Sequence, residues 1–226
     1  MKLPVFLTAL MVAVQIPVHA QDSKPLTTNA EKFSYGIGLQ IAQQLQKQQL
    51  SGVDPRAIVL AIEDVLKGRE LRVTMEEMQV AAVAYQNELK TEKLAAGDKN
   101  KAAGDKFLEE NSTREGVVVL DSGVQYRIIE PGKGGSPTET DSVVVHYRGR
   151  LLNGSEFDSS YSRGQPAELG VGQVIPGWQQ ALQLMPVGSK WEVWIPASLA
   201  YGAQGAGSIG PNETLHFDIE LIEIKG

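Results

Sequence analysis

Apolar residues in the first part of the chain recur at helical spacing. Every fourth position from residue 33 to residue 45 is apolar, which predicts a first helix over about residues 28–50 with one apolar face. These positions are Phe33, Ile37, Ile41 and Leu45. A second helix is predicted to begin at Asp54-Pro55, an N-cap followed by proline at the first helical position, and to end at Gly68. Its apolar positions are Ile58, Ile62, Val65 and Leu66.

A third helix is predicted from Thr74, where Glu77 three residues later completes a capping box, to about Asn111. In its second half Ala-Ala-Gly-Asp occurs at residues 95–98 and again at 102–105, among Lys, Glu and Asn. A helix so polar is expected to bridge solvent between two bodies. Its two glycines each cost about 1 kcal/mol relative to alanine, so bending or fraying is expected there. The alternative is a disordered charged linker.

The composition changes near Arg114 from Ala, Gln, Lys and Glu to Gly, Val, Pro and aromatic residues. Alternating patterns after this point predict strands, separated by turns rich in Gly and Pro. The predicted strands are Val117–Leu120, Val124–Ile129, Ser142–Arg148, Lys190–Ile195 and Thr214–Ile224. One helix is predicted after Pro176-Gly177, ending at Pro186. The expected fold is α+β, with a twisted antiparallel sheet wrapping a short helix.

The N-terminus has the features of a cleaved signal peptide over residues 1–20. Lys2 precedes an apolar run that ends at Val18-His19-Ala20, and the run is too short and too rich in proline for a transmembrane helix. We therefore expect export to the periplasm, with association with the outer membrane or cell surface as a further option. Cleavage removes Lys2 and moves the formal charge from −6 to −7, which argues against nucleic-acid binding.

Two short amphipathic helices cannot bury their apolar faces alone, and a long polar segment separates them from the C-terminal part. A second copy of the chain is the expected partner, which predicts a homodimer through the N-terminal helices. The predicted organisation is a signal peptide at 1–20, a helical dimerisation domain at 21–73, a long connecting helix at 74–113 and a C-terminal domain at 114–226.

Several kinds of chemistry are disfavoured. The chain has no Cys, which excludes disulfides and thiol catalysis. His146 and His216 lie on strand faces opposite the apolar residues, with no acid or histidine at ligand spacing, so surface roles are expected. No Gly-x-Ser-x-Gly is present. Residues 205–210 formally match G-x-G-x-x-G, but a β run rather than a helix follows, so a flexible loop is expected instead of a dinucleotide site.

The remaining candidate chemistry is a set of aromatic residues beside Gly and Pro. Such a set can form an apolar pocket with few polar groups, although a single ring is more often part of the core. The motifs are Val144–Tyr147, Glu156–Ser160, Val174–Trp178, Leu199–Gly202 and Thr214–Phe217. At these residues, and from about Asp121 to Gly226, the chain closely resembles the FKBP-type peptidyl-prolyl cis/trans isomerases. The helical N-terminal part resembles the exported macrophage-infectivity-potentiator kind.

The resemblance implies a prolyl-binding site. Trp178 would form its floor, and its walls would be Tyr147, Phe157, Val174, Ile175 and Phe217. Asp158 and Tyr201 would be its polar members, with the Ile175 amide as a donor to the substrate and Arg163 as the charge partner of Asp158. Tyr147, Asp158 and Tyr201 are the expected catalytic residues. Ala167 and Leu169 stand where many members have Phe, which bears on substrate preference and on binding of macrolide inhibitors of the FK506 and rapamycin type.

The implied activity is rotation of X-Pro bonds in unfolded or partly folded polypeptides, assisting the folding of exported proteins, together with chaperone activity. Rotation breaks amide resonance, a barrier of roughly 18–20 kcal/mol, and makes or breaks no covalent bond, so no metal or cofactor is needed. Two alternatives remain at this stage. One is a holdase chaperone or binding module whose isomerase activity is incidental, and the other is a surface-associated virulence factor.

Overall fold

The computed structural model describes residues 25–48, 50 and 52–225. The signal peptide expected at residues 1–20 lies outside the described residues. Contacts between Cα atoms divide the chain into two units, which meet in sequence at Leu71 and Arg72. Within the described residues, no helix combines the length and the apolar character needed to cross a bilayer.

The first unit contains two helices, as predicted. Helix α1 (Asn29–Lys47) begins after Thr28, whose hydroxyl accepts from the Glu31 amide while the Glu31 side chain returns to Thr28. Helix α2 (Pro55–Leu66) begins after Asp54, whose carboxylate accepts from the Arg56 amide. Both end two or three residues before the predicted limits, and the apolar side chains of α1 are not buried in the single chain.

Helix α3 (Met75–Ser112) opens the second unit with the predicted capping box between Thr74 and Glu77. It is one continuous helix of 38 residues through both Ala-Ala-Gly-Asp sequences. The alternative of a disordered linker is therefore wrong, and so is the expected fraying at the glycines.

The expectation that the second half of α3 bridges solvent is also wrong. Gly97, Gly104 and Asn111 are buried at a spacing of seven residues, along one face of the helix. The Asn111 amide donates to Gln125 at 2.8 Å, and the Gln125 amide donates to the Leu108 carbonyl at 2.8 Å. The helix packs on the C-terminal domain through small residues and amides, so it needs little apolar surface to do so.

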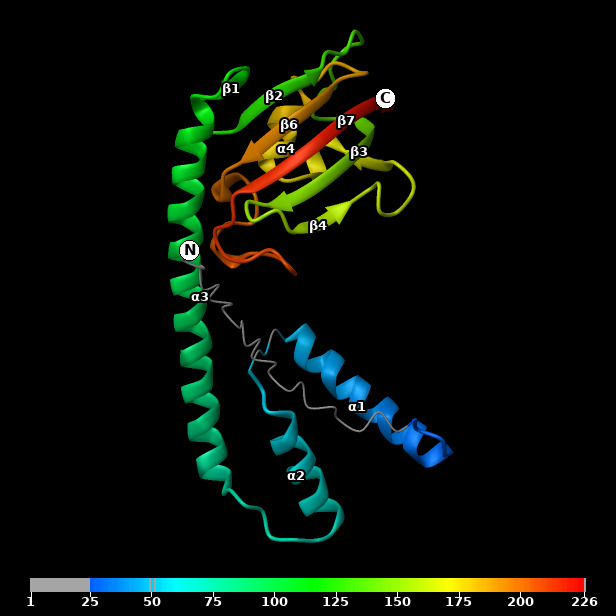
Figure 1. Ribbon diagram of the computed structural model, residues 1–226, viewed down its shortest axis with the longest axis vertical. Helices are drawn as coiled ribbons and strands as arrows, with labels where there is room; N and C mark the ends of the chain where they lie inside the picture. The colour runs from blue at the N-terminus through cyan, green and yellow to red at the C-terminus, as the bar shows by residue number, and fades with distance from the viewer. Residues whose placement is uncertain (1–24, 49, 51, 226) are drawn as a thin grey trace, which may run out of the picture. The chain divides into compact units, whose positions relative to one another are not determined.

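A seven-stranded antiparallel sheet follows α3 (Figure 1). The strands are β1 (Val117–Val119), β2 (Gln125–Glu130), β3 (Ser142–Leu151), β4 (Glu156–Ser159), β5 (Ala167–Gly170), β6 (Lys190–Ile195) and β7 (Leu215–Lys225). Their order is β1-β2-β6-β7-β3-β4, and β5 also pairs with β3. This arrangement confirms the predicted α+β class.

Two of these strands were not predicted. Strands β4 and β5 have only four residues each, too few for an alternating pattern to stand out, and both pair with the long strand β3. Phe157 and Asp158 therefore lie within strand β4. The predicted strand Ser142–Arg148 would place Tyr147 near its end, but β3 continues to Leu151 and places this residue in the interior.

Helix α4 (Pro176–Leu182) covers the inner face of the sheet and ends four residues before the predicted limit. Three 3-10 helices accompany it: η1 (Val171–Gln173), η2 (Ala197–Leu199) and η3 (Gly202–Gln204). Alternation along β3 and β7 buries one side of each strand, as predicted. The inward residues of β3 and β7 form one apolar core with α4, and they are Val143, Val145, Tyr147, Leu215, Phe217, Ile219 and Leu221.

Candidate active site

Trp178 is placed in the first turn of α4 by its two predecessors. Pro176 occupies the start of the helix, where its missing N–H costs nothing. A Cβ on Gly177 would lie 2.3 Å from Cγ2 of Ile195, so only glycine lets the helix approach β6 this closely. The indole is consequently only 4% exposed and lies at the base of a pocket.

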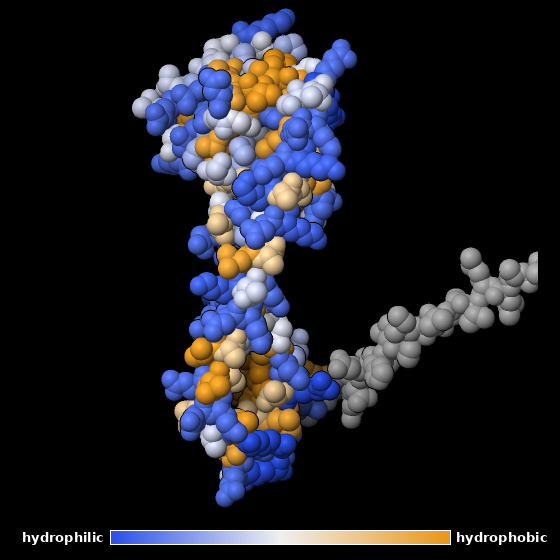
Figure 2. Space-filling view, turned by 90° about the vertical axis from the view of Figure 1, so that its left-hand side faces the viewer, coloured by the Kyte–Doolittle hydropathy of each residue, from blue (hydrophilic) through white to orange (hydrophobic). Residues whose placement is uncertain are grey.

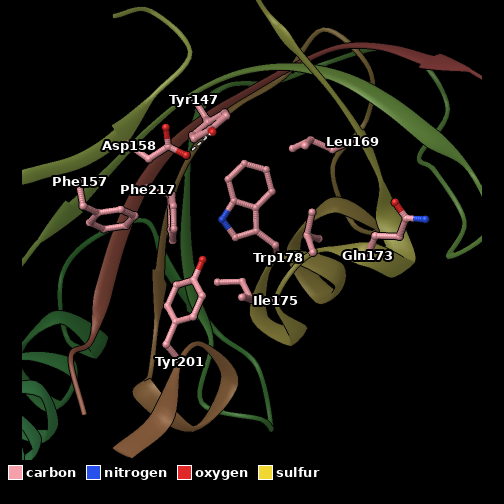
Figure 3. Close-up of a pocket in the computed structure, with 10 residues that line it drawn as sticks. Tyr147, Phe157, Asp158, Leu169, Gln173, Ile175, Trp178, Tyr201 and Phe217 are labelled. Atoms are coloured by element: carbon pink, nitrogen blue, oxygen red, sulfur yellow. Dashed lines mark hydrogen bonds between the residues drawn. The ribbon is translucent and has the colours of Figure 1, made fainter. Parts of the chain in front are cut away.

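Two further rings meet this indole at right angles, and a third ring meets one of those two (Figure 3). Tyr147 meets Trp178 with ring centres 5.3 Å apart, and Phe217 meets it at 5.2 Å. Phe157 then meets Phe217 at 5.6 Å. Edge-to-face contacts of this kind are favourable beyond the area that they bury, so the rings hold one another in fixed orientations.

Gly149 on β3 makes room for two of these rings. A Cβ there would lie 2.6 Å from Cζ of Phe157 and 2.7 Å from Cε1 of Phe217. Any side chain would have to displace both rings, so the site requires glycine at this position.

The pocket has a volume of about 340 Å³, within the range of small-ligand sites. Eight of the nine residues expected at the site line it: Tyr147, Phe157, Asp158, Val174, Ile175, Trp178, Tyr201 and Phe217. Arg163 does not line the pocket but contacts two residues that do. Leu169, noted as a departure from the family pattern, and Gln173, which was not singled out, also line it. Gln173 lies in the single turn of η1, which no pattern in the sequence indicated.

The polar edge of the pocket is a three-residue network. The Tyr147 hydroxyl donates to Oδ2 of Asp158 at 2.5 Å, and Nη2 of Arg163 donates to that hydroxyl at 2.8 Å. Arg163 also forms an ion pair with Asp158. Burial alone would raise the pKa of Asp158, but the hydrogen bonds from Tyr147 and Arg163 and the Arg163 charge outweigh it and lower the pKa. Burial and the bond to Asp158 raise the pKa of Tyr147.

Two donors on the other side of the pocket remain available to a ligand. The Tyr201 hydroxyl is directed into the pocket from the segment between η2 and η3 (Figure 3). The Ile175 amide donates no hydrogen bond to another residue in the described part of the chain, whereas its carbonyl accepts from Trp178 and Gln179. The site thus combines an apolar cup with a few hydrogen-bond donors and a carboxylate held as an anion.

Comparison with known proteins identifies the family of this chain. Residues 133–222 match the family model of the FKBP-type peptidyl-prolyl cis-trans isomerases, and residues 30–128 match the domain amino terminal to it. The chain is 42% identical over 231 residues to the outer membrane protein MIP of Legionella longbeachae, covering 100% of this chain and 99% of that one. The chain belongs to the FKBP-type peptidyl-prolyl cis-trans isomerase family. It is an isomerase of peptidyl-prolyl bonds.

Other FKBP-type proteins agree over most of the chain. It is 48% identical over 192 residues to the FKBP-type 22 kDa peptidyl-prolyl cis-trans isomerase of Escherichia coli strain K12, covering 84% of this chain and 93% of that one. The crystal structure of FkpA from Escherichia coli is similar with a TM-score of 0.63 and 30% identity, covering 89% of this chain and 99% of that one. The similarity therefore covers the helical N-terminal part as well as the sheet.

Residues 205–210 of this FKBP-type chain, where a flexible loop is expected from the sequence, form a loop that packs on the core. Ala206 and Ile209 close it by a short β-bridge, and no helix follows it. Gly205 has φ +67°, and a Cβ there would lie 2.3 Å from the Ile209 carbonyl oxygen. Ile209 is buried in the core, so the loop is anchored at its tip rather than open to a phosphate.

The expectation for the histidines needs one correction. His216 lies within 4.8 Å of carboxylate oxygens of Glu192 and Asp218, so acids do lie at ligand spacing. The period of two along β7 places Asp218 beside His216, and β6 brings Glu192 opposite Asp218. Arg127 pairs with Glu192 at 2.5 Å and Arg150 with Asp218 at 2.6 Å. The two guanidinium groups balance both carboxylates, so this cluster is an ion-pair network on the outer face.

Proposed function

We propose that X-Pro bonds rotate in the pocket above Trp178, with the proline ring on the indole. The support is the edge-to-face arrangement of Tyr147, Phe217 and Trp178 around an open pocket. The Ile175 amide and the Tyr201 hydroxyl would hold the substrate carbonyls, because both residues line the pocket and neither group donates a hydrogen bond within the described residues. Asp158 would face the twisting amide.

The physical basis of the proposal is amide resonance. The planar amide carries separated charge on its nitrogen and oxygen, and rotation removes this separation at a barrier of roughly 18–20 kcal/mol. A pocket lined with rings solvates the planar form poorly and the twisted form comparatively well. Donors fixed in position can then hold the rotating carbonyl better in the transition state than in either ground state.

In this proposal, Asp158 acts as a fixed charge and not as a proton carrier. Its pKa lies below the ordinary value because Tyr147 and Arg163 donate to it despite its partial burial. Rotation needs no proton transfer, so activity should stay constant down to the pH at which Asp158 takes up a proton. We expect Tyr147 and Arg163 to keep the carboxylate oriented toward the substrate.

The experiment is catalysis of proline-limited refolding, alongside kcat/KM on a short X-Pro peptide. Trp178→Leu should lower kcat/KM at least tenfold, because the floor loses most of its contact with the proline ring. Asp158→Asn keeps the shape and removes the charge, and Asp141→Asn is its matched control on the surface. Unchanged catalysis in both pocket variants would refute the proposed mechanism.

We also propose that the chain is exported to the periplasm and assembles as a homodimer through its N-terminal helices. One relative is named an outer membrane protein, which supports export with an option of outer-membrane or surface association. In the single chain Phe33 is 72% exposed, Val65 67% and Met75 74%. Apolar residues, orange in Figure 2, reach the molecular surface on the face shown there. Light scattering on the chain from residue 21 should give a dimer, and deletion of residues 21–73 should give a monomer.

The proposed substrates are unfolded or partly folded polypeptides that contain proline, and the same pocket would accept macrolide inhibitors of the FK506 and rapamycin type. Leu169 at the pocket wall bears on how tightly a large macrolide ring fits. Competition of such a macrolide with the peptide substrate tests this assignment, because a ligand of this pocket must raise KM without lowering kcat.

A holdase chaperone is the second candidate, and the exposed apolar residues of α1, α2 and the start of α3 favour it. In a dimer, the apolar residues of both protomers could bind an unfolded chain between them. Aggregation assays on the chain with and without residues 21–73 separate the two roles. Equal protection by both would refute the holdase role of the helices, while isomerase activity on a short peptide should be the same in both.

A further inference from the structure

We propose that α3 takes part in the isomerase site by positioning Tyr201, and that Asn212 is the residue that connects them. The proposal concerns the second half of α3 and the segment Gly202–Thr214, which follows Tyr201 and leads into β7. Both lie within the second unit of the chain (Figure 1). It rests on the role proposed above for Tyr201.

The helix approaches this segment closely at two glycines. A Cβ on Gly104 would lie 2.3 Å from Oγ1 of Thr214, and a Cβ on Gly97 would lie 3.2 Å from Nδ2 of Asn212. The two glycines are seven residues apart, two turns of helix, so they face the same side. At Gly104 the cost in helix propensity is therefore offset by a contact that a Cβ would disrupt, and at Gly97 a Cβ would be tight against Asn212.

Hydrogen bonds fix the segment to the helix at this contact. The Asn100 amide donates to the Pro211 carbonyl at 2.9 Å. One residue further along, the Asn212 amide side chain donates to the Gly97 carbonyl at 3.3 Å. The helix donates one of these bonds and the segment donates the other. Together they hold the segment in a fixed position against α3.

Asn212 transmits this restraint to Tyr201. Its backbone is in the left-handed region with φ 54°, the sole non-glycine residue of the described ranges with positive φ. In this conformation its side chain reaches α3 while its backbone N–H donates to the Gly202 carbonyl at 2.8 Å. Gly202 directly follows Tyr201, and the Tyr201 carbonyl accepts from the Gly205 amide at 3.2 Å. One residue thus ties the helix to the turn that carries the tyrosine.

The consequence is that α3 restrains a group at the pocket rather than serving only as a spacer. Tyr201 is 39% exposed and projects from a short turn, so few contacts of its own fix its position. If this turn were mobile, the Tyr201 hydroxyl would occupy many positions. A hydrogen-bond donor stabilises the transition state only when it is held in the required position.

The test uses the full chain with single substitutions on both elements. Asn212→Gly allows φ 54° without strain but removes the bond to Gly97. Asn100→Ala removes the bond to Pro211, and Asn87→Ala is the matched control at an exposed position of the same helix. We expect kcat/KM on a short X-Pro peptide to fall about three- to tenfold in the first two and to stay unchanged in the third.

A double-mutant cycle with Tyr201→Ala distinguishes positioning from general destabilisation. If Asn212 and Asn100 act through Tyr201, their substitution lowers kcat/KM no further once the tyrosine side chain is gone. The same additional loss in the Tyr201→Ala background would overturn the proposal, as would full activity of both variants. Full activity of Tyr201→Ala alone would instead overturn the proposed role of Tyr201 at the site.

Discussion

The two faces of the sheet are built in opposite ways. The inner face is apolar and packs on α4, with Val143, Val145 and Ile219 fully buried. The outer face carries charges that pair across strands, Arg127 with Glu192, Arg150 with Asp218 and Arg148 with Glu156. Trp194 is 2% exposed on this outer face, although it is not part of the apolar core, and His216 stacks on it.

The comparison shows where this fold places its chemistry. Rings that must stay dry and mutually oriented gather on the inner face, where α4 and β4 leave an opening. The charged side chains of the outer face pair with one another, and α3 joins this face at Gln125 through amide hydrogen bonds. Changes on the inner face should therefore reach catalysis directly, while changes on the outer face should act on stability and on the docking of α3.

The largest effect is expected from Gly149→Ala on the inner face. The new Cβ must displace the rings of Phe157 and Phe217, so kcat/KM should fall at least tenfold. Overpacking of this kind typically costs about 1–3 kcal/mol in the free energy of unfolding. Gly135→Ala is the control, because its Cβ would meet nothing within 4 Å. Peptide kinetics and urea unfolding of both variants check this, and equal activity of the two would contradict the role of the rings.

Gly104→Ala should have the next largest effect, and mainly on stability. Its Cβ overlaps Oγ1 of Thr214, at a cost of about 1–3 kcal/mol, against a gain in helix propensity of about 1 kcal/mol. The net loss should be partly restored by Thr214→Ala, which removes the overlapping oxygen. Urea unfolding of the single and double variants measures this. A stabilised Gly104→Ala would mean that α3 is not held against the domain.

A smaller effect is expected from the pH dependence of His216. Burial and then the Arg150 charge lower its pKa, while Glu192 and Asp218 raise it only in part. The unfolded chain, with a pKa of about 6.5, then binds the proton first as pH falls. The contribution of His216 to the free energy of unfolding is therefore fully present above about pH 6.5. It decreases as the pH falls from there to the pKa of the folded state, and it changes no further below that pKa.

His216→Gln removes this contribution while keeping a polar side chain. The difference in free energy of unfolding between about pH 8 and about pH 5.5 should be smaller in the variant than in the parent chain. His146→Gln, on the same outer face, is the comparison. An unchanged or larger pH difference in His216→Gln would show that its burial is not maintained in solution.

The smallest effect is expected from an exposed ion pair on α3. Lys101 and Asp105 form an exposed pair one turn apart, with side chains 64% and 65% exposed. Such pairs contribute no more than about 0.5 kcal/mol, so Lys101→Ala should leave unfolding nearly unchanged. A loss as large as that of Gly104→Ala would mean that this side of the helix is covered in solution.

The sequence predicted the apolar side of this molecule better than its polar side. Alternation along β3 and β7 located the core, and the aromatic motifs located the pocket lining. The glycines of α3 read as weak points in the sequence, because the partner of Gly104, Thr214, is 110 residues away and no periodicity reveals such a contact.

Other features depended on the same kind of distant pairing. Strands β4 and β5 exist because β3 provides the hydrogen bonds for such short segments. The charge network around His216 required the register of β6 against β7, although the His-x-Asp spacing of His216 and Asp218 was a usable signal of two side chains on one face.

The central claim is that X-Pro rotation occurs in the ring-lined pocket above Trp178. Exchange NMR on a labelled chain with a proline-containing peptide tests in one experiment where the X-Pro bond rotates and how fast it rotates. The account predicts faster cis/trans exchange of the peptide, together with shifts of the Trp178 indole N–H and the Ile175 amide as peptide is added. Faster exchange with those two signals unmoved, and shifts confined to the N-terminal helices, would contradict it.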